Sequence, residues 1–197
     1  KIIARRDIHY VMLSSRKVYS PKATMPATEG SETFGIDDYG RNKRRTERAL
    51  ENILGSRLTV FRLANVAGFD DQWNRPTFMA RMLSGLRSHG QVTLDLNPSA
   101  RRDFITDDAV ADVLVQAANK RIEGCFNLGS GIALGLGSLA DWIIEGFAQG
   151  EVVTTSLDVR DEFVLSVSKL KSQFSINCTS EDIKSKCFEA GRSLTGV

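Results

Sequence analysis

The apolar residues of this chain fall into short continuous runs and longer stretches with helical spacing. The run at 10–14 is almost wholly apolar, which is typical of a strand buried on both faces of a parallel sheet. Residues 21–37 contain two prolines and two glycines and are predicted to form a loop. A helix is predicted over 38–54, with Gly55 as its stop. Its apolar face is expected to consist of Ala49, Leu50, Ile53 and Leu54. A second apolar run at 57–68 completes a β-α-β unit, the building block of a doubly wound α/β sheet.

Beyond Gly68 the pattern changes. Residues 91–96 alternate apolar and polar side chains like a half-buried strand, and the run at 124–131 predicts another strand. Helical spacing recurs at 76–90, 106–120, 138–150 and 181–194. The sequence has no internal repeat and no low-complexity segment, so it predicts an ordinary α/β protein.

Composition and charge exclude several classes of partner. The 197 residues are 42% hydrophobic and 25% charged, as in a globular protein with a substantial core. With 26 basic and 24 acidic residues, the formal net charge is only +2, which gives no general electrostatic case for binding nucleic acid or an acidic membrane. No apolar stretch approaches the ~20 residues of a membrane span, and we expect no signal peptide before the fold. We therefore expect neither a nucleic acid nor a membrane as partner.

The cysteines and the first residue bear on location and completeness. Three cysteines and two histidines, with no close pair of cysteines, predict neither a disulfide framework nor a metal site. A reducing, cytoplasmic location is therefore expected. The first residue is Lys1 rather than Met, and residues 1–13 resemble the end of a helix that runs into a strand. We expect the chain to begin within a domain.

A glycine cluster offers one candidate binding loop. Gly129, Gly131 and Gly135 lie between a predicted strand and a predicted helix, as in a dinucleotide-binding loop. Asp158 follows at a distance that would suit a ribose partner. The spacing, however, is Gly-x-Gly-x-x-x-Gly and does not match Gly-x-Gly-x-x-Gly. A flexible connection between strand and helix is the favoured interpretation, and the phosphate loop remains the alternative.

A tyrosine, a lysine and a serine form the main candidate for catalysis. Tyr39 and Lys43 lie four residues apart in the predicted helix, so a phenol and an ammonium share one face. A nearby cation favours the phenolate, which otherwise forms only near pH 10, and so prepares the phenol for acid–base catalysis. Ser15 lies at the carboxyl end of a predicted parallel strand, where open α/β sheets place ligand-contacting groups. Its hydroxyl could hold a substrate oxygen against the phenol.

Each of these residues also has an ordinary structural interpretation. A Tyr-x-x-x-Lys pair can belong to a solvated helix face, and Ser14 and Ser15 alone would be unremarkable at the end of a strand. Their order along the chain, together with the flanking residues, favours the catalytic interpretation.

Five segments of the sequence resemble motifs of the extended short-chain dehydrogenases/reductases, in the family's order and at compatible spacing. Within this family, the resemblance is to the NAD-dependent epimerase/dehydratase group that acts on nucleotide sugars. The resemblance covers essentially the whole chain. The segments are VMLSSRKVYS, YGRNKRRTE, FRLANVAG, RRDFITDDAVADVL and GCFNLGSG.

The resemblance implies roles for individual residues. Tyr39 and Lys43 match the family's catalytic pair, and Ser15 matches its catalytic serine or threonine. Tyr39 would then move the proton, Lys43 would lower the pKa of Tyr39 and bind the nicotinamide ribose, and Ser15 would polarise the reacting oxygen. Asn65 matches a substrate-side asparagine.

Arg102 matches an arginine that commonly meets the diphosphate of the nucleotide sugar. A guanidinium suits diphosphate oxygens because its donors are paired in a fixed plane. From the local sequence alone, an ion pair with Asp103, Asp107 or Asp108 is an equally good interpretation. The resemblance favours the ligand, and it favours Arg102 over Arg101 because Arg102 directly precedes the Asp-Phe pair.

The sequence also departs from the family's pattern. The Gly-x-x-Gly-x-x-Gly phosphate loop, expected roughly a hundred residues upstream, is absent from these residues. By the same resemblance, the glycines of GCFNLGSG belong to a late strand and hold no cofactor phosphate. Arg16 and Lys17 stand where sugar 4,6-dehydratases carry Asp-Glu, which disfavours water elimination. Ala67 replaces a usual tyrosine and changes the expected substrate pocket.

The resemblance implies the carboxyl-terminal part of a Rossmann-like doubly wound parallel sheet with an interleaved, smaller α/β substrate lobe. Residues 1–68 and 103–130 are assigned to the dinucleotide-binding domain, and 69–102 and 131–197 to the substrate-binding lobe. The expected function is epimerisation or keto reduction of a nucleotide sugar with NAD or NADP, in a protein that is a homodimer when intact. The alternative is a catalytically idle dinucleotide-binding or scaffold relative of the same fold.

Overall fold

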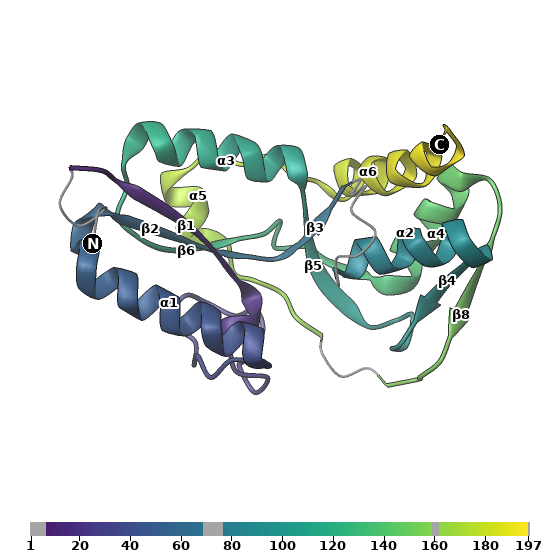
Figure 1. The fold of residues 1–197 in the computed structure, drawn as a ribbon, viewed down its shortest axis with the longest axis horizontal. Helices are drawn as coiled ribbons and strands as arrows, with labels where there is room; N and C mark the ends of the chain where they lie inside the picture. Colours follow the sequence, from purple (N-terminus) through teal and green to yellow (C-terminus); the bar gives the residue numbers. More distant parts are fainter. Residues whose placement is uncertain (1–6, 69–76, 159–161, 197) are drawn as a thin grey trace. The chain divides into compact units, whose positions relative to one another are not determined.

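The structure is a computed structural model that describes residues 7–68, 77–158 and 162–196. The chain divides into two compact units. Unit 1 consists of Lys1–Ala64, Asp108–Gly131 and Leu165–Asn177, and unit 2 consists of Asn65–Asp107, Ile132–Val164 and Cys178–Val197. The helices and strands of both units are shown in Figure 1. Because each unit is assembled from three separate segments, the chain passes between the units several times.

Unit 1 is built on a parallel sheet of three strands in the order β1-β2-β6. The strands are β1 (Tyr10–Ser15), β2 (Leu58–Leu63) and β6 (Gly124–Leu128). Leu13 lies opposite Phe61, and Phe61 lies opposite Phe126. Since the strands are parallel, their carboxyl ends, including Ser15, lie at one edge of the sheet.

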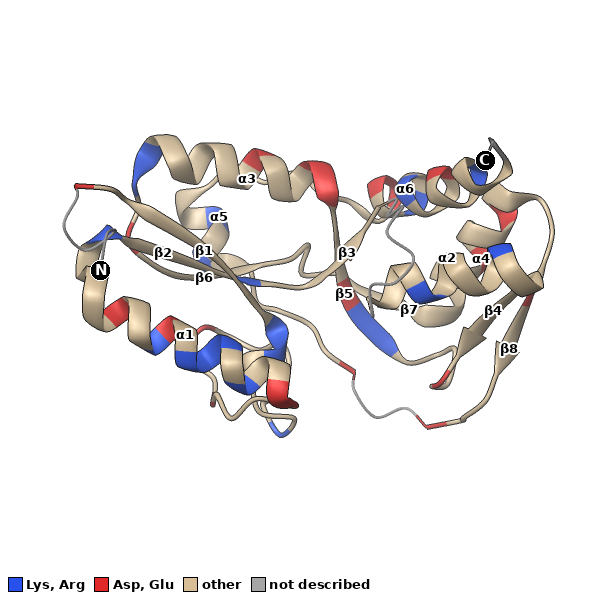
Figure 2. Ribbon diagram, viewed as in Figure 1, with Lys and Arg blue, Asp and Glu red and all other residues tan. Residues whose placement is uncertain are grey.

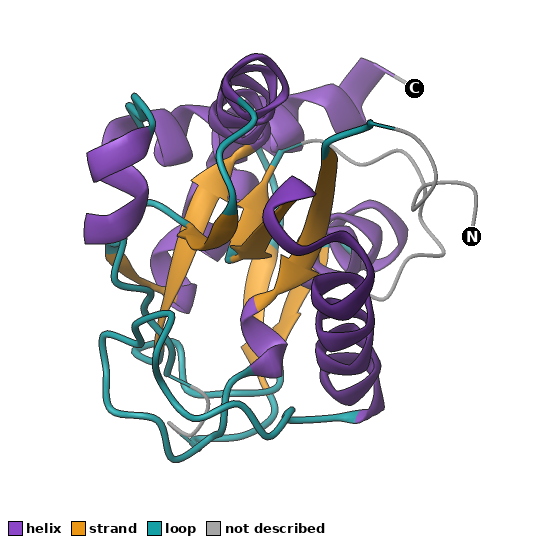
Figure 3. Ribbon diagram, turned by 90° about the vertical axis from the view of Figure 1, so that its left-hand side faces the viewer, coloured by secondary structure: helices purple, strands orange, loops and turns teal. Residues whose placement is uncertain are grey.

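Helices cover both faces of this sheet. One face carries α1 (Asp38–Leu54), and the other carries α3 (Asp107–Lys120) and α5 (Ser168–Gln173), as Figures 1 and 3 show. On the α1 side the apolar cluster consists of Met12, Leu54, Leu58 and Val60. On the opposite side the rings of Phe61, Phe126 and Phe174 pack with centroids 5.3 to 6.0 Å apart.

Short 3-10 turns of the chain are η2 (Arg16–Val18), η3 (Gly55–Arg57) and η4 (Leu194–Gly196).

The buried face of α1 differs from the one expected from the sequence. The side chain of Ile53 is 53% exposed and Ala49 is also exposed, whereas the buried positions are Gly40, Glu47 and Leu54. These three residues are spaced by seven, so they form one line along the helix. The expected apolar face was therefore wrong in part, because a glycine and a carboxylate occupy most of the contact line.

Unit 2 contains two small sheets. One has the order β3-β5-β7, with β3 parallel and β7 antiparallel to β5, and the other pairs β4 with β8 in parallel. The strands are β3 (Asn65–Ala67), β4 (Gln91–Leu94), β5 (Arg101–Thr106), β7 (Ala133–Gly135) and β8 (Glu151–Thr154). The helices are α2 (Phe78–His89), α4 (Leu136–Phe147) and α6 (Ser180–Ser193).

The core of unit 2 is an extended apolar cluster between these helices and strands, including Leu83, Phe104 and Ile143. Helices α4 and α6 come unusually close. A Cβ atom at Gly146 would lie 2.0 Å from the Phe188 carbonyl oxygen, and one at Gly191 would lie 2.0 Å from the Ile143 carbonyl oxygen. Glycine is required at both positions because the two backbones touch there.

The α/β fold class predicted from the sequence is confirmed, and α1 has the predicted bounds. The buried strand predicted within 57–68 is confirmed as β2. Its predicted end in a loop is wrong, since the chain continues after Ala64 into β3 of unit 2. The sequence did not predict β5, β7, β8 or α5. Leu165–Asn177 belongs to unit 1, although all of 131–197 was assigned to the substrate lobe. The roles expected for the two units stay predictions.

No helix in the part of the chain that the structure describes is long and apolar enough to cross a membrane. Among the same residues, no group of histidine, cysteine and acidic side chains has an arrangement that could hold a metal ion.

Candidate active site

Ser15 is the last residue of β1 and the N-cap of the turn η2. Its backbone is extended, and its Oγ accepts a hydrogen bond of 3.2 Å from the backbone N–H of Lys17. The side chain is half-buried. Ser15 therefore lies where the sequence placed it, at the carboxyl end of a parallel strand.

The first turn of α1 packs directly on η2. Asp37 caps the helix, because its Oδ1 accepts a hydrogen bond of 2.8 Å from the backbone N–H of Gly40. A Cβ atom at Gly40 would lie 2.1 Å from the carbonyl oxygen of Lys17. Only glycine allows this approach, which brings the helix turn of Tyr39 onto the turn that Ser15 caps.

Tyr39 and Lys43 share one face of α1, as predicted. The Lys43 ammonium donates a hydrogen bond of 2.8 Å to the Leu13 carbonyl oxygen at the end of β1. The same Nζ atom lies 5.6 Å from the centroid of the Tyr39 ring. The side chain of Tyr39 is 52% exposed. Unit 1 thus brings Tyr39 and Lys43 to the end of the strand that carries Ser15.

The electrostatics of Tyr39 differ from the expectation. The pKa of Tyr39 is raised from its ordinary value, first by burial and second by the negative charge of Asp37. The net shift is therefore upward, opposite to the lowering expected from Lys43.

A second lysine lies close to the same ring. The Lys17 ammonium is 6.0 Å from the centroid of Tyr39, and it forms an ion pair of 2.7 Å with Asp37. Burial alone would raise the pKa of Asp37, but the hydrogen bonds from Lys17 and Gly40 outweigh it and lower that pKa. The phenol is therefore flanked by two ammonium groups and one carboxylate.

Asn65 and Arg102 both belong to unit 2. Asn65 begins β3, and its Nδ2 donates a hydrogen bond of 3.0 Å to the Asp103 carbonyl oxygen. The side chain of Arg102, on β5, is 7% exposed, and its guanidinium lies 5.3 Å from the Phe78 ring centroid. The neighbouring Arg101 is exposed and donates to the Ala133 carbonyl oxygen at 2.7 Å. Figure 2 shows this pair of basic residues on β5 and further basic positions along α1.

The glycine cluster has structural explanations. The backbone N–H groups of Leu136 and Gly137, at the start of α4, donate to the carbonyl oxygens of Ala100 and Pro98 at 3.0 and 2.8 Å. A Cβ atom at Gly137 would lie 3.0 Å from Pro98 Cβ. These donors are engaged by the protein's own backbone, which favours the interpretation as a connection over a phosphate loop.

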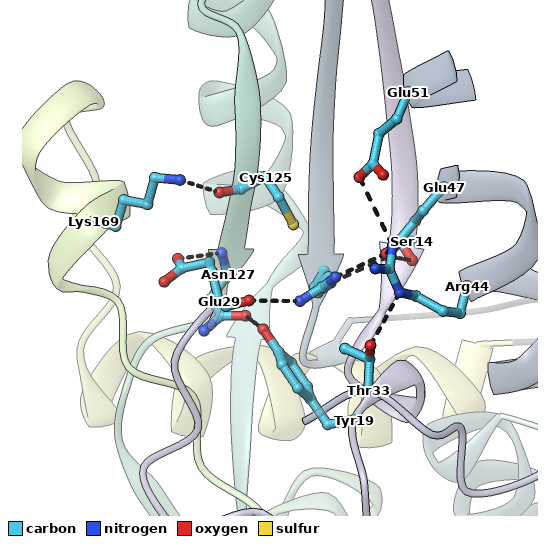
Figure 4. Close-up of polar contacts among 11 residues, drawn as sticks. Ser14, Tyr19, Glu29, Thr33, Arg44, Glu47, Glu51, Cys125, Asn127 and Lys169 are labelled. Carbon is cyan, nitrogen blue, oxygen red and sulfur yellow. Dashed lines mark hydrogen bonds and ion pairs between the residues drawn. The ribbon is translucent and has the colours of Figure 1, made fainter. Parts of the chain in front are cut away.

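A buried polar network behind the candidate site was missed at the sequence level. Glu47 and Arg62 form an ion pair of 2.9 Å, and the exposed fractions of their side chains are 0% and 4%. Figure 4 shows this network, which extends to Ser14, Arg44 and Tyr19. Two signals in the sequence could have revealed it. Glu47 lies four residues after Lys43, on the same helix face, and Arg62 interrupts the apolar run of β2.

The sequence profile described as the NAD dependent epimerase/dehydratase family matches residues 1–129. The chain belongs to this family. The family consists of NAD-dependent enzymes, which confirms the resemblance found in the sequence. None of the curated proteins matches the chain.

Solved structures of low sequence identity share the fold. A UDP-N-acetylglucosamine 4-epimerase from Methanobrevibacter ruminantium M1, in complex with UDP-N-acetylmuramic acid, is 18% identical with a TM-score of 0.81, over 95% of this chain and 63% of its own. The UDP-N-acetylglucosamine 4-epimerase from Bacillus cereus is 22% identical with a TM-score of 0.75, over 96% and 66%. RMD from Pseudomonas aeruginosa, complexed with NADPH, is 16% identical with a TM-score of 0.74, over 93% and 66%.

These similarities confirm the Rossmann-like fold. This chain corresponds to about two thirds of the length of the structures that it resembles.

Proposed function

We propose that the protein is an NAD(P)-dependent epimerase or keto-reductase of nucleotide sugars, in which Ser15, Tyr39 and Lys43 carry out proton transfer at a sugar carbon. The observation that carries the proposal is the placement of the Lys43 ammonium. The Leu13 carbonyl oxygen holds it at the face of the Tyr39 ring, beside the carboxyl end of β1. Membership of an NAD-dependent family supports the cofactor. The UDP-sugar bound by a structural neighbour supports the substrate class.

In the direction of reduction, hydride reaches the carbonyl carbon of the sugar while the carbonyl oxygen takes a proton. The Tyr39 hydroxyl would donate that proton, since a phenol with a pKa of about 10 or above is protonated at neutral pH. The Ser15 hydroxyl would donate a hydrogen bond to the same oxygen and hold it against the phenol. In the reverse direction Tyr39 would accept the proton, which requires the phenolate to be stabilised by the cations beside it.

A nicotinamide dinucleotide, when bound, supplies the hydride acceptor or donor. The residues of unit 1 fit its ribose. An ammonium has three N–H donors, and Lys43 uses one of them for the Leu13 carbonyl oxygen, so the others can reach ribose hydroxyls. Tyr39 is half-exposed, and its hydroxyl can join them. The Gly-x-x-Gly-x-x-Gly loop that would hold the dinucleotide phosphates is not part of the 197 residues.

Asn65 and Arg102, two residues of unit 2, are proposed to bind the nucleotide sugar. The amide of Asn65 has two donors and one acceptor, and the Asp103 carbonyl oxygen uses one donor. The Arg102 guanidinium rests on the Phe78 ring, which restricts the plane of its donors. A planar, permanently charged group is suited to the oxygens of a diphosphate. The homodimer expected for the intact protein stays a prediction.

A catalytically idle relative of the same fold is the second candidate function. The raised pKa of Tyr39 favours it, because a phenol that resists ionisation is a poor proton acceptor in the oxidative direction. In such a protein the serine, tyrosine and lysine would be present without turnover.

Turnover of a nucleotide sugar separates the two candidates. We expect a protein that contains these residues and the remainder of the Rossmann domain to convert UDP-N-acetylglucosamine or a related UDP-sugar in the presence of NAD or NADP. Tyr39→Phe should lower kcat by about 10²-fold or more, because it removes the proton-transfer group while the ring still packs. Tyr10→Phe is the matched control, since Tyr10 packs at the other end of β1. No turnover by the unsubstituted protein, or normal turnover by Tyr39→Phe, would contradict the proposal.

A further inference from the structure

Glu47 is a fully buried carboxylate with four hydrogen bonds. Its Oε1 accepts from Ser14 Oγ at 2.5 Å and from Arg62 Nε at 3.2 Å. Its Oε2 accepts from Arg62 Nη2 at 2.9 Å and from Arg44 Nη1 at 3.0 Å. Arg62 and Glu47 are therefore paired through two parallel bonds, a geometry that fixes both side chains in one plane. Figure 4 shows Ser14 and Arg44 close to the Glu47 carboxylate.

The carboxylate lies on the same helix face as the candidate catalytic pair. Tyr39, Lys43 and Glu47 are spaced by four residues, so they follow one another along the side of α1 that faces β1. Lys43 contacts the carbonyl oxygen of Leu13, and Glu47 contacts the hydroxyl of the next residue, Ser14. The two contacts therefore link consecutive residues of β1 to consecutive turns of α1.

Arg62 connects this contact to the rest of unit 1. It lies opposite Ser14 in the parallel pairing of β1 and β2. Its Nη1 donates to the Glu29 carbonyl oxygen at 3.1 Å, and its guanidinium lies 4.9 Å from the Tyr19 ring centroid. Burial alone would lower the pKa of Arg62, but the hydrogen bond to Glu47 outweighs it and raises that pKa. Arg62 is therefore charged within the fold.

Stability alone does not explain a buried pair at this place. Replacing a buried ion pair with apolar residues of similar volume is often neutral or stabilising. The other buried positions of α1, Gly40 and Leu54, limit how closely the helix approaches the sheet but have no directional partner. A polar residue in such a contact line is the feature that specifies one helix register among several. A shift of one residue would rotate the helix by about 100° and move it by about 1.5 Å.

We propose that Glu47 is a positioning residue, whose bonds with Arg62 and Ser14 fix the rotation and register of α1 on β1 and thereby hold Tyr39 and Lys43 at the Ser15 end of the strand. The catalytic meaning of this inference rests on the proposed function. The positioning itself concerns only the structure of unit 1 and can be measured without substrate.

The direct test removes both charges together. The double variant Glu47→Met/Arg62→Met leaves neither charge unpaired and keeps unbranched side chains of similar length. Titration of ¹³C-labelled tyrosine by NMR in the 197-residue chain reads the environment of Tyr39. We expect the pKa of Tyr39 to fall toward its ordinary value, because the phenol loses its fixed place beside Asp37 and the buried surroundings of the strand end. In the catalytically complete protein we expect kcat to fall up to ~10²-fold, the effect of a misplacement of about 1 Å, with a smaller change in KM.

Two further variants keep the test decisive. Val60→Ala, in the apolar cluster on the same side of the sheet, lowers stability without touching the pair and should leave the Tyr39 titration unchanged. Ser14→Ala removes a single bond to Glu47 and should shift the titration in the same direction as the double variant, by less. If the double variant does not fold, the titration of Ser14→Ala provides the test in its place.

The outcomes separate this inference from the proposed function. A folded double variant, or Ser14→Ala, whose Tyr39 titration and kcat equal those of the unsubstituted protein would overturn the positioning role. A Val60→Ala titration shift as large as that of the double variant would also overturn it, because any loss of stability would then have the same effect. A titration shift specific to the pair supports the positioning role even if no nucleotide sugar is turned over, in which case the proposed function alone fails.

Discussion

The two units bury polar groups in different ways. In unit 1 an ion pair, Glu47 with Arg62, lies inside the fold, and the neighbouring Tyr19 hydroxyl donates to Asn127 Oδ1 at 2.5 Å. In unit 2 the core between the helices is an extended apolar cluster, and among the residues of unit 2 that the structure describes, the buried polar side chains lie on one strand, β5. Directional contacts fix a geometry, whereas apolar contacts mainly supply stability. Unit 1 is therefore built to hold polar groups at fixed distances, whereas unit 2 is an apolar scaffold for the strand that carries Arg102.

The largest effects on the free energy of unfolding are expected when one core residue of each unit is replaced. Phe104→Ala in unit 2 should lower the free energy of unfolding by about 3–5 kcal/mol, through lost burial and a cavity. Arg62→Ala in unit 1 should lower it by a similar amount, about 3–5 kcal/mol, because the Glu47 carboxylate is left buried and unpaired. Urea unfolding followed by circular dichroism measures both.

The variants Arg62→Met and Glu47→Met/Arg62→Met separate the cost of an unpaired buried charge from the other contributions of Arg62. The double variant should be more stable than the single one, since no charge remains without a partner. Equal stability of the single and double variants would show that the ion pair is not what Arg62 contributes.

Alkaline pH should lower the free energy of unfolding of unit 1, because the buried Tyr19 phenol resists ionisation. Burial raises the pKa of Tyr19 to about 12 from 10.0, despite the nearby Arg62. A group whose pKa is raised by folding contributes stability that is fully present below pH 10 and is lost as the pH rises toward 12. About 2–3 kcal/mol should be lost over this interval. Tyr19→Phe should remove that part of the slope in a pH series of urea unfolding curves, and an unchanged slope would contradict the assignment.

Two glycines provide a matched test of which unit carries the chemistry. An added Cβ would meet a backbone carbonyl oxygen at 2.1 Å at Gly40 in unit 1, and at 2.0 Å at Gly146 in unit 2. Both alanine variants should therefore lose about 1–3 kcal/mol through overpacking. Only Gly40→Ala should also reduce kcat in the catalytically complete protein, because it pushes the turn of Tyr39 away from η2. Equal loss of kcat in the two variants would remove the distinction between the units.

Local signals in the sequence predicted α1 correctly, because Gly55 ends it and a loop rich in turn residues precedes it. The passage from β2 to β3 could not be predicted, since the run LTVFRLANVA continues through Ala64 while the chain enters another sheet. Strand β5 was missed because its first three residues, Arg101, Arg102 and Asp103, are charged and do not follow the apolar pattern of a buried strand.

For the candidate site, too, the sequence predicted the positions of residues but not their contacts. The spacing of Tyr39 and Lys43 was visible in the sequence, and so was the position of Ser15. The upward shift of the Tyr39 pKa could not be predicted, because it depends on burial and on the nearby charge of Asp37. The partner of the Lys43 ammonium, a backbone carbonyl oxygen thirty residues away in the chain, could not be predicted either. Contacts of this kind leave no pattern in a single sequence.

We propose a division of labour in which unit 1 binds the dinucleotide and transfers the proton, while unit 2 binds the nucleotide sugar. Calorimetric titration of Lys43→Ala and Arg102→Ala in the catalytically complete protein, each with dinucleotide and with UDP-sugar, tests it most directly. We predict that Lys43→Ala loses affinity for the dinucleotide, and that Arg102→Ala loses about 1.5–3 kcal/mol of affinity for the UDP-sugar while it binds the dinucleotide normally. Arg102→Lys should recover only part of that loss, because the charge returns without the planar pair of donors. Equal losses of both ligands in both variants, or a loss of folding stability in Arg102→Ala with UDP-sugar affinity intact, would contradict the claim.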